Sequence, residues 1–441
     1  MKPEIKQRIE QICRGEVPEG YKKTKTGILP EDWIVCKIDD CLKRIENPVT
    51  VQADEQYTQI GIRSHGKGLF YKEPVSGKSL GNKNVFWVIP NCFVLNIVFA
   101  WEQAIGKTTQ AEEGMIGSHR FPMYYPKNNK VDIDYLISYF LTKRGTDILD
   151  AASPGGAGRN RTLGQERFMQ SIIILPSLAE QQKIANILST QDRVIELYEK
   201  KIEQLQLLKK ICLKKMFPKE GSLVPEVRFP GFTAPWEQCK LGELFEFLQN
   251  NTLSRAELNN ESGVAKNIHY GDILIKFGEC IDISIAIIPF ISSRSIADKF
   301  KNSFLKNGDI IMADTAEDET VGKCSEVFGI QNIPIISGLH TIPIRPRKEF
   351  ALGYLGYYMN SVAYHDQLIP LMHGVKVTSI SKGEIKNTNI SYPKDKDEQA
   401  RLGLFFLHID HLITLHQRRL DEEKRKKKAL MQLLLTGIVR V

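Results

Sequence analysis

The sequence predicts an α+β protein in which one unit, a mixed α/β domain followed by a long helix, occurs twice as a pseudo-twofold internal repeat. Three observations predict this fold class: a duplicated Trp-x-x-Cys-Lys cluster, two long stretches of heptad-spaced apolar residues, and short apolar runs between them. The chain has 441 residues, which is too long for one ordinary core because domains of about 150 residues are typical.

The duplicated cluster marks the start of each copy. Trp33 and Cys36 in the first copy return as Trp236 and Cys239 in the second. Further positions repeat in the same order, namely Gly117, His119 and Pro122 against Gly338, His340 and Pro343. The separation between equivalent residues grows along the chain, as expected when two copies of one fold differ in loop length.

Each copy ends in a predicted long helix. A proline precedes each helix and a Glu-Gln pair follows that proline, after which apolar residues alternate at spacings of four and three. These seam positions are Ile184, Leu188, Ile195, Ile202 and Leu205 in the first helix, and Leu402, Phe406, Ile409, Ile413 and Leu420 in the second. A helix of about 35 residues is roughly 50 Å long and would expose a continuous apolar stripe if it stood alone.

Two matched apolar stripes in one chain are most economically buried against each other, so we expect the two long helices to pair. The alternative is that each is a core helix of its own domain. Five polar residues interrupt the stripes and would weaken the pairing locally, namely Gln191, Lys209, His416, Glu423 and Lys427.

The regions between the long helices combine strand and helix patterns. Short apolar or β-branched runs predict strands over residues 85–88, 94–99, 172–175, 273–277, 310–312 and 341–344. Helical periodicity predicts one helix over residues 134–149 and one over residues 351–364. Four prolines make residues 218–235 the best linker candidate.

Composition bounds the function only loosely. The net charge is +8, which is compatible with a polyanionic partner without requiring one. The eight cysteines show no zinc-finger spacing, so we expect reduced thiols and a cytoplasmic location. The most apolar windows are far shorter than the roughly 20 residues that a membrane helix needs.

Four elements in a fixed order carry a family resemblance. They are Leu29-Pro30-Glu31-Asp32-Trp33, the run Val224-Pro225-Glu226-Val227-Arg228-Phe229-Pro230-Gly231-Phe232, the two Pro-then-Glu-Gln helix starts, and the closing residues 434–441. With these elements the chain resembles, over essentially its whole length, the specificity (S) subunit of type I restriction-modification systems.

The resemblance implies a division of labour along the chain. An N-terminal segment (1–28) would precede a first target-recognition domain (29–176), a first spacer helix (177–217) and a linker (218–235). A second target-recognition domain (236–393) and a second spacer helix with the C-terminal tail (394–441) would follow. Each domain would read one half of a bipartite, asymmetric double-stranded DNA target, and the helices would form an antiparallel coiled coil between the domains.

The resemblance also implies partners. Two methylation (M) subunits would pack near the coiled coil, and motor-nuclease (R) subunits would join them for restriction, so that the chain directs adenine methylation or cleavage without being an enzyme itself. S-adenosylmethionine, ATP and Mg²⁺ would belong to those partners. We expect this chain to bind no cofactor and no metal, and to contact no membrane.

The sequence lacks the complete motifs of ATP-binding proteins and of adenine methyltransferases. Gly106-Lys107-Thr108 resembles the end of a phosphate-binding loop, but Trp101 stands where its first glycine is needed. No Asn-Pro-Pro-aromatic or Asp-Pro-Pro-aromatic run of a methyltransferase occurs. The alternative that stays open is a self-contained DNA nuclease with an unrecognised carboxylate site in the second domain, built from Asp309, Asp314 and Glu317.

Candidate DNA contacts are Arg, Lys, His, Asn, Gln or Tyr side chains on predicted loops, because these groups reach base edges and phosphates. In the first domain they are Arg63, His65, Lys67, Lys107, Gln110, Arg159, Asn160 and Arg161; in the second they are His269, Tyr270, Lys276, Lys323, His373 and Lys376. Arg159 to Arg161 follow the glycine-rich stretch 155–158, which is either a flexible loop or a backbone that approaches DNA closely. The basic run 424–428 equally suits a phosphate patch, a helix C-terminus or a docking face.

Overall fold

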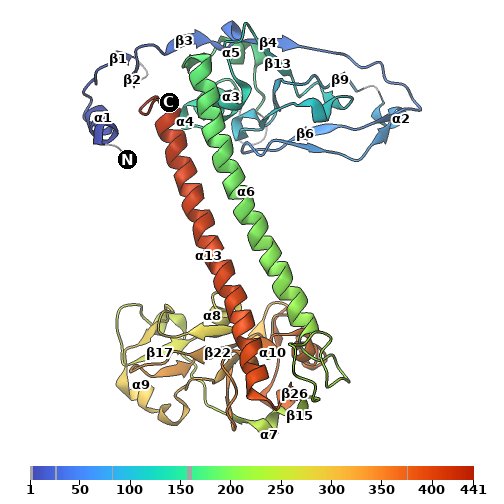
Figure 1. The fold of residues 1–441 in the computed structure, drawn as a ribbon, viewed down its shortest axis with the longest axis vertical. Coiled ribbons are helices and arrows are strands. Elements are labelled where there is room, and N and C mark those ends of the chain that lie inside the picture. The colour runs from blue at the N-terminus through green and yellow to red at the C-terminus, as the bar shows by residue number, and fades with distance from the viewer. Residues whose placement is uncertain (1–2, 25–26, 82, 156–160, 375) are drawn as a thin grey trace. The chain divides into compact units, whose positions relative to one another are not determined.

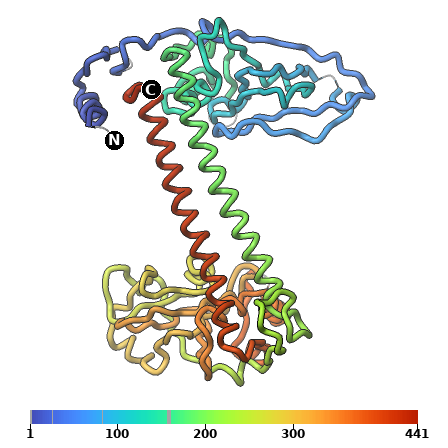
Figure 2. Tube along the Cα trace, viewed as in Figure 1, coloured from blue at the N-terminus to red at the C-terminus, as the bar shows by residue number. Residues whose placement is uncertain are grey.

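The computed structural model describes all residues except 1–2, 25–26, 82, 156–160 and 375. The chain divides into two compact units: a first unit of residues 1–197 and 419–441, and a second unit of residues 198–418. Two long helices, α6 (Leu178–Lys215) and α13 (Lys396–Leu434), each contribute residues to both units. Figure 2 follows the chain from the first unit along α6 into the second and back along α13. The predicted α+β class and the repeat are confirmed (Figure 1).

The first unit centres on a four-stranded antiparallel sheet with strand order β11-β10-β13-β4. Its strands are β1 (Tyr21–Thr24), β2 (Gly27–Pro30), β3 (Ile34–Lys37), β4 (Leu42–Ile45), β5 (Gln56–Tyr57), β6 (Ile60–Ile62), β7 (Leu69–Tyr71), β8 (Val75–Ser76), β9 (Val85–Trp87), β10 (Phe93–Leu95), β11 (Ile105–Lys107), β12 (Ile116–Ser118), β13 (Met123–Pro126) and β14 (Ile172–Leu175). Its short helices are α1 (Pro3–Cys13), η1 (Ile38–Asp40), α2 (Gly77–Leu80), η2 (Ala100–Glu102), η3 (Gln110–Glu112), α3 (Ile133–Phe140), α4 (Lys143–Ala151) and α5 (Gln165–Gln170).

The core of the first unit is aromatic. All three residues of β10 are buried, as expected for an inner strand that is covered on both faces. The Phe93 ring packs against Phe140 and Phe168, with centroids 5.4 Å and 6.3 Å apart. Leu434, at the end of α13, joins the same cluster as Ile184 near the start of α6. The last turn of α13 is therefore part of the first unit's core.

The second unit holds a five-stranded sheet, β16-β24-β20-β22-β18, and a three-stranded sheet, β19-β17-β23. Its strands are β15 (Glu237–Lys240), β16 (Phe245–Phe247), β17 (Ala265–Ile268), β18 (Cys280–Asp282), β19 (Phe290–Ile291), β20 (Ile310–Ala313), β21 (Thr315–Ala316), β22 (Cys324–Phe328), β23 (Ile335–Ser337), β24 (Thr341–Pro346), β25 (Thr378–Ser379) and β26 (Asn389–Tyr392). Its short helices are α7 (Leu241–Leu244), η4 (Arg255–Glu257), α8 (Tyr270–Ile275), α9 (Arg294–Asp298), η5 (Lys301–Ser303), α10 (Tyr354–Met359), α11 (Val362–His365), η6 (Ile369–Leu371) and α12 (Lys382–Ile385).

The repeat is visible as one strand pair in each unit. The strand that begins at the duplicated cluster pairs antiparallel with the strand that precedes the long helix. Cys36 faces Ile173 in the β3–β14 pair, and Cys239 faces Ile390 in the β15–β26 pair.

The core of the second unit resembles that of the first, because the end of a long helix packs into it. Phe217, just after α6, stacks on Phe406 of α13 with centroids 5.8 Å apart.

Three local expectations are wrong. Residues 134–149 form two helices, α3 and α4, because the Thr142 side chain accepts the Gly145 N–H and starts a new helix. Residues 351–364 likewise divide into α10 and α11. Residues 273–277 are not a strand but lie largely in α8, since the His269 ring accepts the Gly271 N–H and caps a helix there. A short apolar run does not distinguish a strand from a short helix.

A buried carboxylate anchors the start of each long helix. In the first unit the Glu180 carboxylate accepts the Trp33 indole N–H at 3.3 Å and two Arg440 donors at 2.6 Å and 2.8 Å. In the second unit the Glu398 carboxylate accepts the Trp236 indole N–H at 3.3 Å and two Arg228 donors at 2.6 Å and 2.7 Å. The duplicated tryptophan and glutamate of the sequence therefore form one anchor, repeated.

The glutamine beside each anchor has the same duplicated role. The side-chain amide of Gln181 donates to the Pro176 carbonyl at 3.0 Å, and that of Gln399 donates to the Pro393 carbonyl at 2.8 Å. Each glutamine oxygen also accepts a backbone N–H, from Asp132 in the first unit and from Ala351 in the second. The Pro-then-Glu-Gln pattern thus attaches each long helix to its own mixed domain.

We expect Arg228→Met to lower the free energy of unfolding of the second unit by about 3–5 kcal/mol, because it leaves Glu398, which is 1% exposed, with a buried unpaired charge. The measurement is urea unfolding followed by hydrogen exchange of β20, which lies in the second unit. Lys301→Met is the matched control in the same unit: the side chains of its ion pair with Asp298 are 64% and 47% exposed, so a change within about 0.5 kcal/mol is expected. Equal losses in both variants would contradict the anchor.

A second stability prediction concerns Glu326. Its buried carboxylate accepts the N–H groups of Gly353 and Gly356, each at 2.9 Å, and burial raises its pKa to about 7. Since this pKa lies above the ordinary 4.5, the folded protein favours the protonated form, and the stabilisation present below pH 4.5 is lost as the pH rises to about 7.

Glu326→Gln stays neutral at every pH and should therefore gain relative to the parent as the pH rises. We expect the difference in free energy of unfolding between the two proteins to move in favour of the variant by up to roughly 3 kcal/mol between pH 5 and pH 8. Thermal unfolding at the two pH values measures it. A difference that is independent of pH would show that Glu326 does not titrate in this range.

Candidate nucleic-acid interface

In the first unit, the predicted contact loop between β6 and β7 is held against η2. The backbone N–H groups of His65 and Gly66 donate to the carbonyls of Glu102 and Gln103 at 2.7 Å and 2.9 Å. His65 itself has a positive φ of 60°, which fits a tight turn. The side chains of Arg63, His65 and Lys67 are exposed, so the fixed backbone presents three polar side chains to solvent.

Arg161 also lies against η2 and already bonds to groups of the protein. Its guanidinium stacks over the Trp101 ring, 5.3 Å from the centroid, and bonds to the Ser153 carbonyl and to the Asp150 carboxylate at 2.7 Å. The structure therefore brings the 63–67 loop and Arg161 to the same short helix. Two further predicted contacts, Arg159 and Asn160, lie outside the described residues.

The other two first-unit candidates interact with acidic neighbours. Lys107 forms an ion pair with Asp134 at 2.6 Å, and the Gln110 side chain bonds to Glu113. Beside the 63–67 loop, a pocket of about 420 Å³ is lined by Phe70, Phe99 and Phe121 together with polar side chains. Sequence reasoning gave no sign of this pocket, because its aromatic residues belong to three separate segments.

In the second unit, three predicted contacts meet at α8. His269 caps the helix, Tyr270 begins it, and Lys276 follows its end. The Tyr270 ring lies between His269, at 4.6 Å between centroids, and His340, at 5.3 Å. Burial lowers the pKa of His269, and the charge of Arg255 acts in the same direction, so the ring is neutral at neutral pH.

Lys323 reaches the same helix from the inside. Its ammonium group donates to the Leu274 carbonyl at 2.9 Å, and burial lowers its pKa. Such a lysine supports α8 rather than offering its charge to solvent.

His373 and Lys376, the remaining two predicted contacts of the second unit, are exposed. The His373 ring contacts the Glu384 carboxylate at 2.5 Å, and its backbone pairs with Ser379 in β25. Because β25 pairs with β21, and Thr315 of β21 lies 3.4 Å from the His340 ring, the 373–376 loop is connected to the α8 cluster through two short strands. Val375 of this loop lies outside the described residues.

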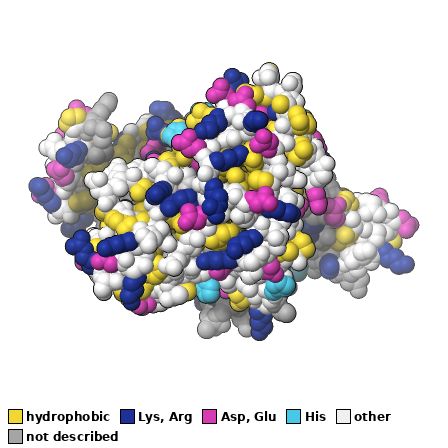
Figure 3. All heavy atoms as spheres, turned by 90° about the horizontal axis from the view of Figure 1, so that it is seen from below, with side chains coloured by type: hydrophobic (Ala, Val, Ile, Leu, Met, Phe, Trp, Pro, Cys, Tyr) yellow, Lys and Arg dark blue, Asp and Glu magenta, His cyan; other side chains and the backbone are white. Residues whose placement is uncertain are grey.

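Sequence reasoning missed Arg255 and Asp272, which bond to each other at 3.0 Å beside Lys276. The only signal was the proximity of Asp272 to His269-Tyr270, since Arg255 stands alone in a polar loop. The sequence predicts His340 as a repeat position and not as a DNA contact. Figure 3 shows basic side chains scattered among acidic and apolar ones on the face it presents, so charge alone does not mark an interface there.

The seam residues of the long helices are buried at nine of the ten predicted positions, and Ile413 is partly buried. Within the first unit, the Gln191 side chain donates to the Glu423 carboxylate, and Lys427 forms an ion pair with Asp192, both at 2.5 Å. In both units α6 and α13 lie side by side (Figure 1).

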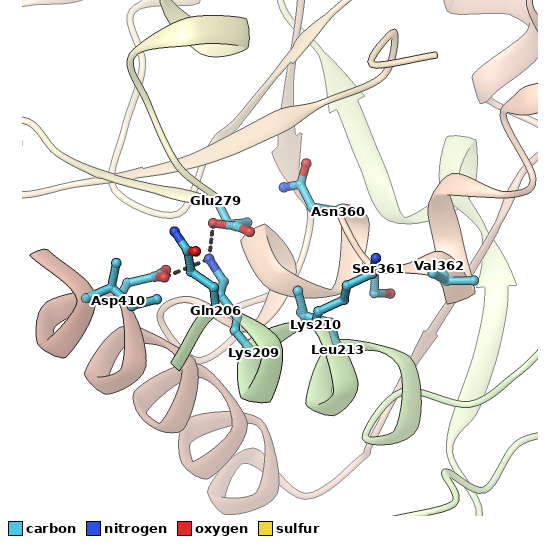
Figure 4. A pocket seen from close by; sticks show the side chains of 10 residues that line it. Gln206, Lys209, Lys210, Leu213, Glu279, Asn360, Ser361, Val362 and Asp410 are labelled. Carbon is cyan, nitrogen blue, oxygen red and sulfur yellow. Dashed lines mark hydrogen bonds and ion pairs between the residues drawn. The ribbon is translucent and has the colours of Figure 1, made fainter. Parts of the chain in front are cut away.

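Within the second unit, polar residues also join α6 to α13. The Lys209 ammonium lies 2.7 Å from both Asp410 and Glu279, beside a pocket of about 420 Å³ (Figure 4). Tyr357 donates its hydroxyl to Asp410 at 2.5 Å. Four of the polar residues that interrupt the seam thus have a hydrogen-bond or ion-pair partner, namely Gln191, Lys209, Glu423 and Lys427. This arrangement explains how a charged lysine is tolerated on a buried stripe.

The carboxylates of the nuclease alternative do not form one site. Asp309 is 1% exposed and accepts two Arg345 donors, whereas Asp314 contacts His340 and Glu317 is exposed. In the described part of the chain, no three His, Cys, Asp or Glu residues are grouped as metal ligands. Within the same residues, no helix has both the length and the apolar character needed to cross a membrane.

Comparison with known proteins agrees with the two-copy fold. The family model described as "Type I restriction modification DNA specificity domain" matches residues 30–207 and 234–424, which is most of the chain and both copies of the repeat. The chain therefore belongs to the type I restriction-modification DNA specificity family. It is a DNA-recognition subunit rather than a catalytic one, and the nuclease alternative is not supported.

Similar proteins cover nearly the full length. A putative type I restriction enzyme MjaX specificity subunit from Methanocaldococcus jannaschii is 24% identical and covers 96% of this chain and 97% of its own. The MjaVIII specificity subunit of the same organism is also 24% identical, with 96% of each chain covered.

Two solved structures share the fold. A chain from a study of complex assembly and conformational transition of the type I R-M system has a TM-score of 0.55 at 17% identity, covering 93% of this chain and 99% of that one. The type I S subunit from M. genitalium has a TM-score of 0.50 at 13% identity, covering 91% and 96%.

Proposed function

We propose that each unit contributes one target-recognition domain, over residues 29–176 and 236–393, and that each domain reads one half of a bipartite, asymmetric DNA target. The observation that carries the proposal is the repeated frame, in which equal anchors and equal strand pairs hold two different sets of exposed polar loops. A shared frame with divergent loops suits two readers of two different sequences.

The candidate contacts divide between the two readers. In the first, the 63–67 loop is the stronger candidate, because His65 and Lys67 are exposed while Arg161 and Lys107 form ion pairs with protein carboxylates. Arg63 is also exposed, although it donates to the Leu69 carbonyl at 3.0 Å and stacks over the Phe70 ring. In the second, the α8 cluster of His269, Tyr270 and Lys276 is favoured over the inward-facing Lys323. Phosphate contacts would supply affinity and base contacts would supply specificity.

We further propose that residues 177–217 and 394–441 form an antiparallel coiled coil that acts as the spacer between the readers. Support comes from contacts inside each unit, where α6 residues with increasing numbers meet α13 residues with decreasing numbers. In the first unit, Ile184 shares a core cluster with Leu434 and Gln191 bonds to Glu423. In the second unit, Tyr198 meets His416 and Lys209 meets Asp410. Residues 218–235 would connect the first spacer helix to the second reader.

The catalytic partners would be two methylation subunits, with motor-nuclease subunits added for restriction. S-adenosylmethionine, ATP and Mg²⁺ would bind to those partners, and the assembly would act on adenines in cytoplasmic DNA. An exposed apolar turn of α6 supports a docking partner, since Leu207, Leu208 and Ile211 are 58%, 44% and 45% exposed.

Replacing residues 30–175 with those of a relative should change only one half of the DNA target, because the second reader keeps its own frame. Mapping methylated adenines in a host that carries the exchanged chain measures this. The reciprocal exchange of residues 237–392 is the matched control and should change only the other half. A change in both halves after either exchange would contradict the modular proposal.

Adding seven residues to both long helices should widen the unread gap of the target by about three base pairs, because two helical turns add about 10 Å. The insertion sites are between Leu197 and Tyr198 and between Arg418 and Arg419, where the chain passes from one unit to the other. Seven residues inserted after Gly221, where the backbone has open space, should leave the gap unchanged. An unchanged gap in the helix variant would mean that the helices do not set the spacing.

A further inference from the structure

A buried carboxylate in α8 holds two cations that remain half exposed. The Asp272 side chain is 2% exposed, whereas those of Arg255 and Lys276 are 50% and 56% exposed. Both cations reach the same oxygen, with Arg255 Nη2 at 3.0 Å and Lys276 Nζ at 2.9 Å from Oδ1. The other oxygen, Oδ2, is buried and has no hydrogen-bond partner among the described residues. The acid therefore lies under the surface and holds both cations from below.

The two cations come from different elements and converge on one place. Arg255 begins η4, and Lys276 directly follows α8. Gly271 leaves room for the guanidinium, because a Cβ atom at that position would lie 3.3 Å from Arg255 Nη2. Burial opposes the ionisation of Asp272, but Lys276 and Arg255 outweigh it and hold its pKa below the ordinary value. The three groups together keep one net positive charge at neutral pH.

A structural ion pair in the same unit looks different. Arg345 meets Asp309 through two donors, at 2.9 Å and 2.6 Å, gives a further bond to the Phe304 carbonyl, and is only 19% exposed. Arg255 gives Asp272 one donor, and for its Nε and Nη1 groups the structure records no partner among the described residues. Arg345 therefore gives its recorded hydrogen bonds to groups of the protein. In the described part of the chain, Arg255 is held through Nη2 alone, and its Nε and Nη1 groups can donate to a ligand.

We propose that Asp272 is a positioning residue that holds Arg255 against the edge of a guanine and Lys276 against a neighbouring phosphate in the half-site read by the second unit; this assignment rests on the proposed function. A guanidinium donates two parallel hydrogen bonds to O6 and N7 of guanine, whereas a lysine acts on phosphate as a compact charge. Anchoring by Asp272 lowers the conformational entropy that the two long side chains lose on binding.

The test compares variants of the full chain, purified from its host with the subunits that accompany it, against a random pool of duplex DNA. Arg255→Lys should reduce the preference for guanine at one position of one half-site by about tenfold, and leave the other half-site unchanged. Lys276→Gln should weaken binding to all sequences alike and lower the slope of log K against log salt by about one.

Asp272→Asn is the decisive variant, because it leaves both cations in place. We expect it to lose the same guanine preference as Arg255→Lys, with a smaller fall in salt slope than Lys276→Gln, because the charge of Lys276 remains but is no longer held by a carboxylate. Asp298→Asn is the matched control, since Asp298 is an exposed acid that pairs with Lys301 in the same unit, and it should leave both readouts unchanged.

The outcomes distinguish the proposed function of the chain from the positioning role of Asp272. A parent chain that selects no two-part sequence would overturn the proposed function. A parent chain that selects one, together with an Asp272→Asn variant that keeps its guanine preference, would overturn the positioning role alone. Loss of selection in both half-sites would also overturn it, because Asp272 would then be supporting the fold. If Asp272→Asn does not fold, an Arg255→Lys variant with unchanged base preference still contradicts the assignment.

Discussion

The structure depends on one interaction that occurs twice, a buried glutamate that binds an indole N–H and a guanidinium. Glu180 and Glu398 are 4% and 1% exposed, so neither charge would be tolerated without its partners. The tryptophan comes from the strand-opening segment, the glutamate from the start of a long helix, and the arginine from the segment that follows the other long helix. Each anchor therefore fixes three distant parts of the chain at one point.

This arrangement explains why the chain must return to where it began. Arg440 completes the first unit as Arg228 completes the second, and the last turn of α13 packs into the first unit's core. Anchors that hold the start of one long helix beside the end of the other in each unit support the proposed antiparallel pairing. The seam then needs only moderate apolar content, and paired residues such as Gln191 and Glu423 are accepted in it.

The sequence was informative wherever a pattern repeats and silent wherever side chains meet from unrelated loops. Heptad spacing and the duplicated Trp33 and Glu180 predicted the long helices and the two-copy fold. The same reasoning could not place Arg255 beside Asp272, because the two residues lie 17 positions apart in separate segments and no spacing pattern links them. It also counted Arg161 and Lys323 as available cations, although both donate to groups of the protein. Burial and pairing of a charge are tertiary properties that a single sequence does not record.

Hydrogen exchange on a Glu180→Gln variant tests the central claim most directly. The anchor account predicts faster exchange in three separate segments together: the residues around Trp33, the first turns of α6, and the residues that end at Arg440. Exchange in the second unit, for instance in β20, should stay as it was, because Glu398 holds its own anchor. Faster exchange confined to the start of α6, or spread evenly over both units, would contradict the account.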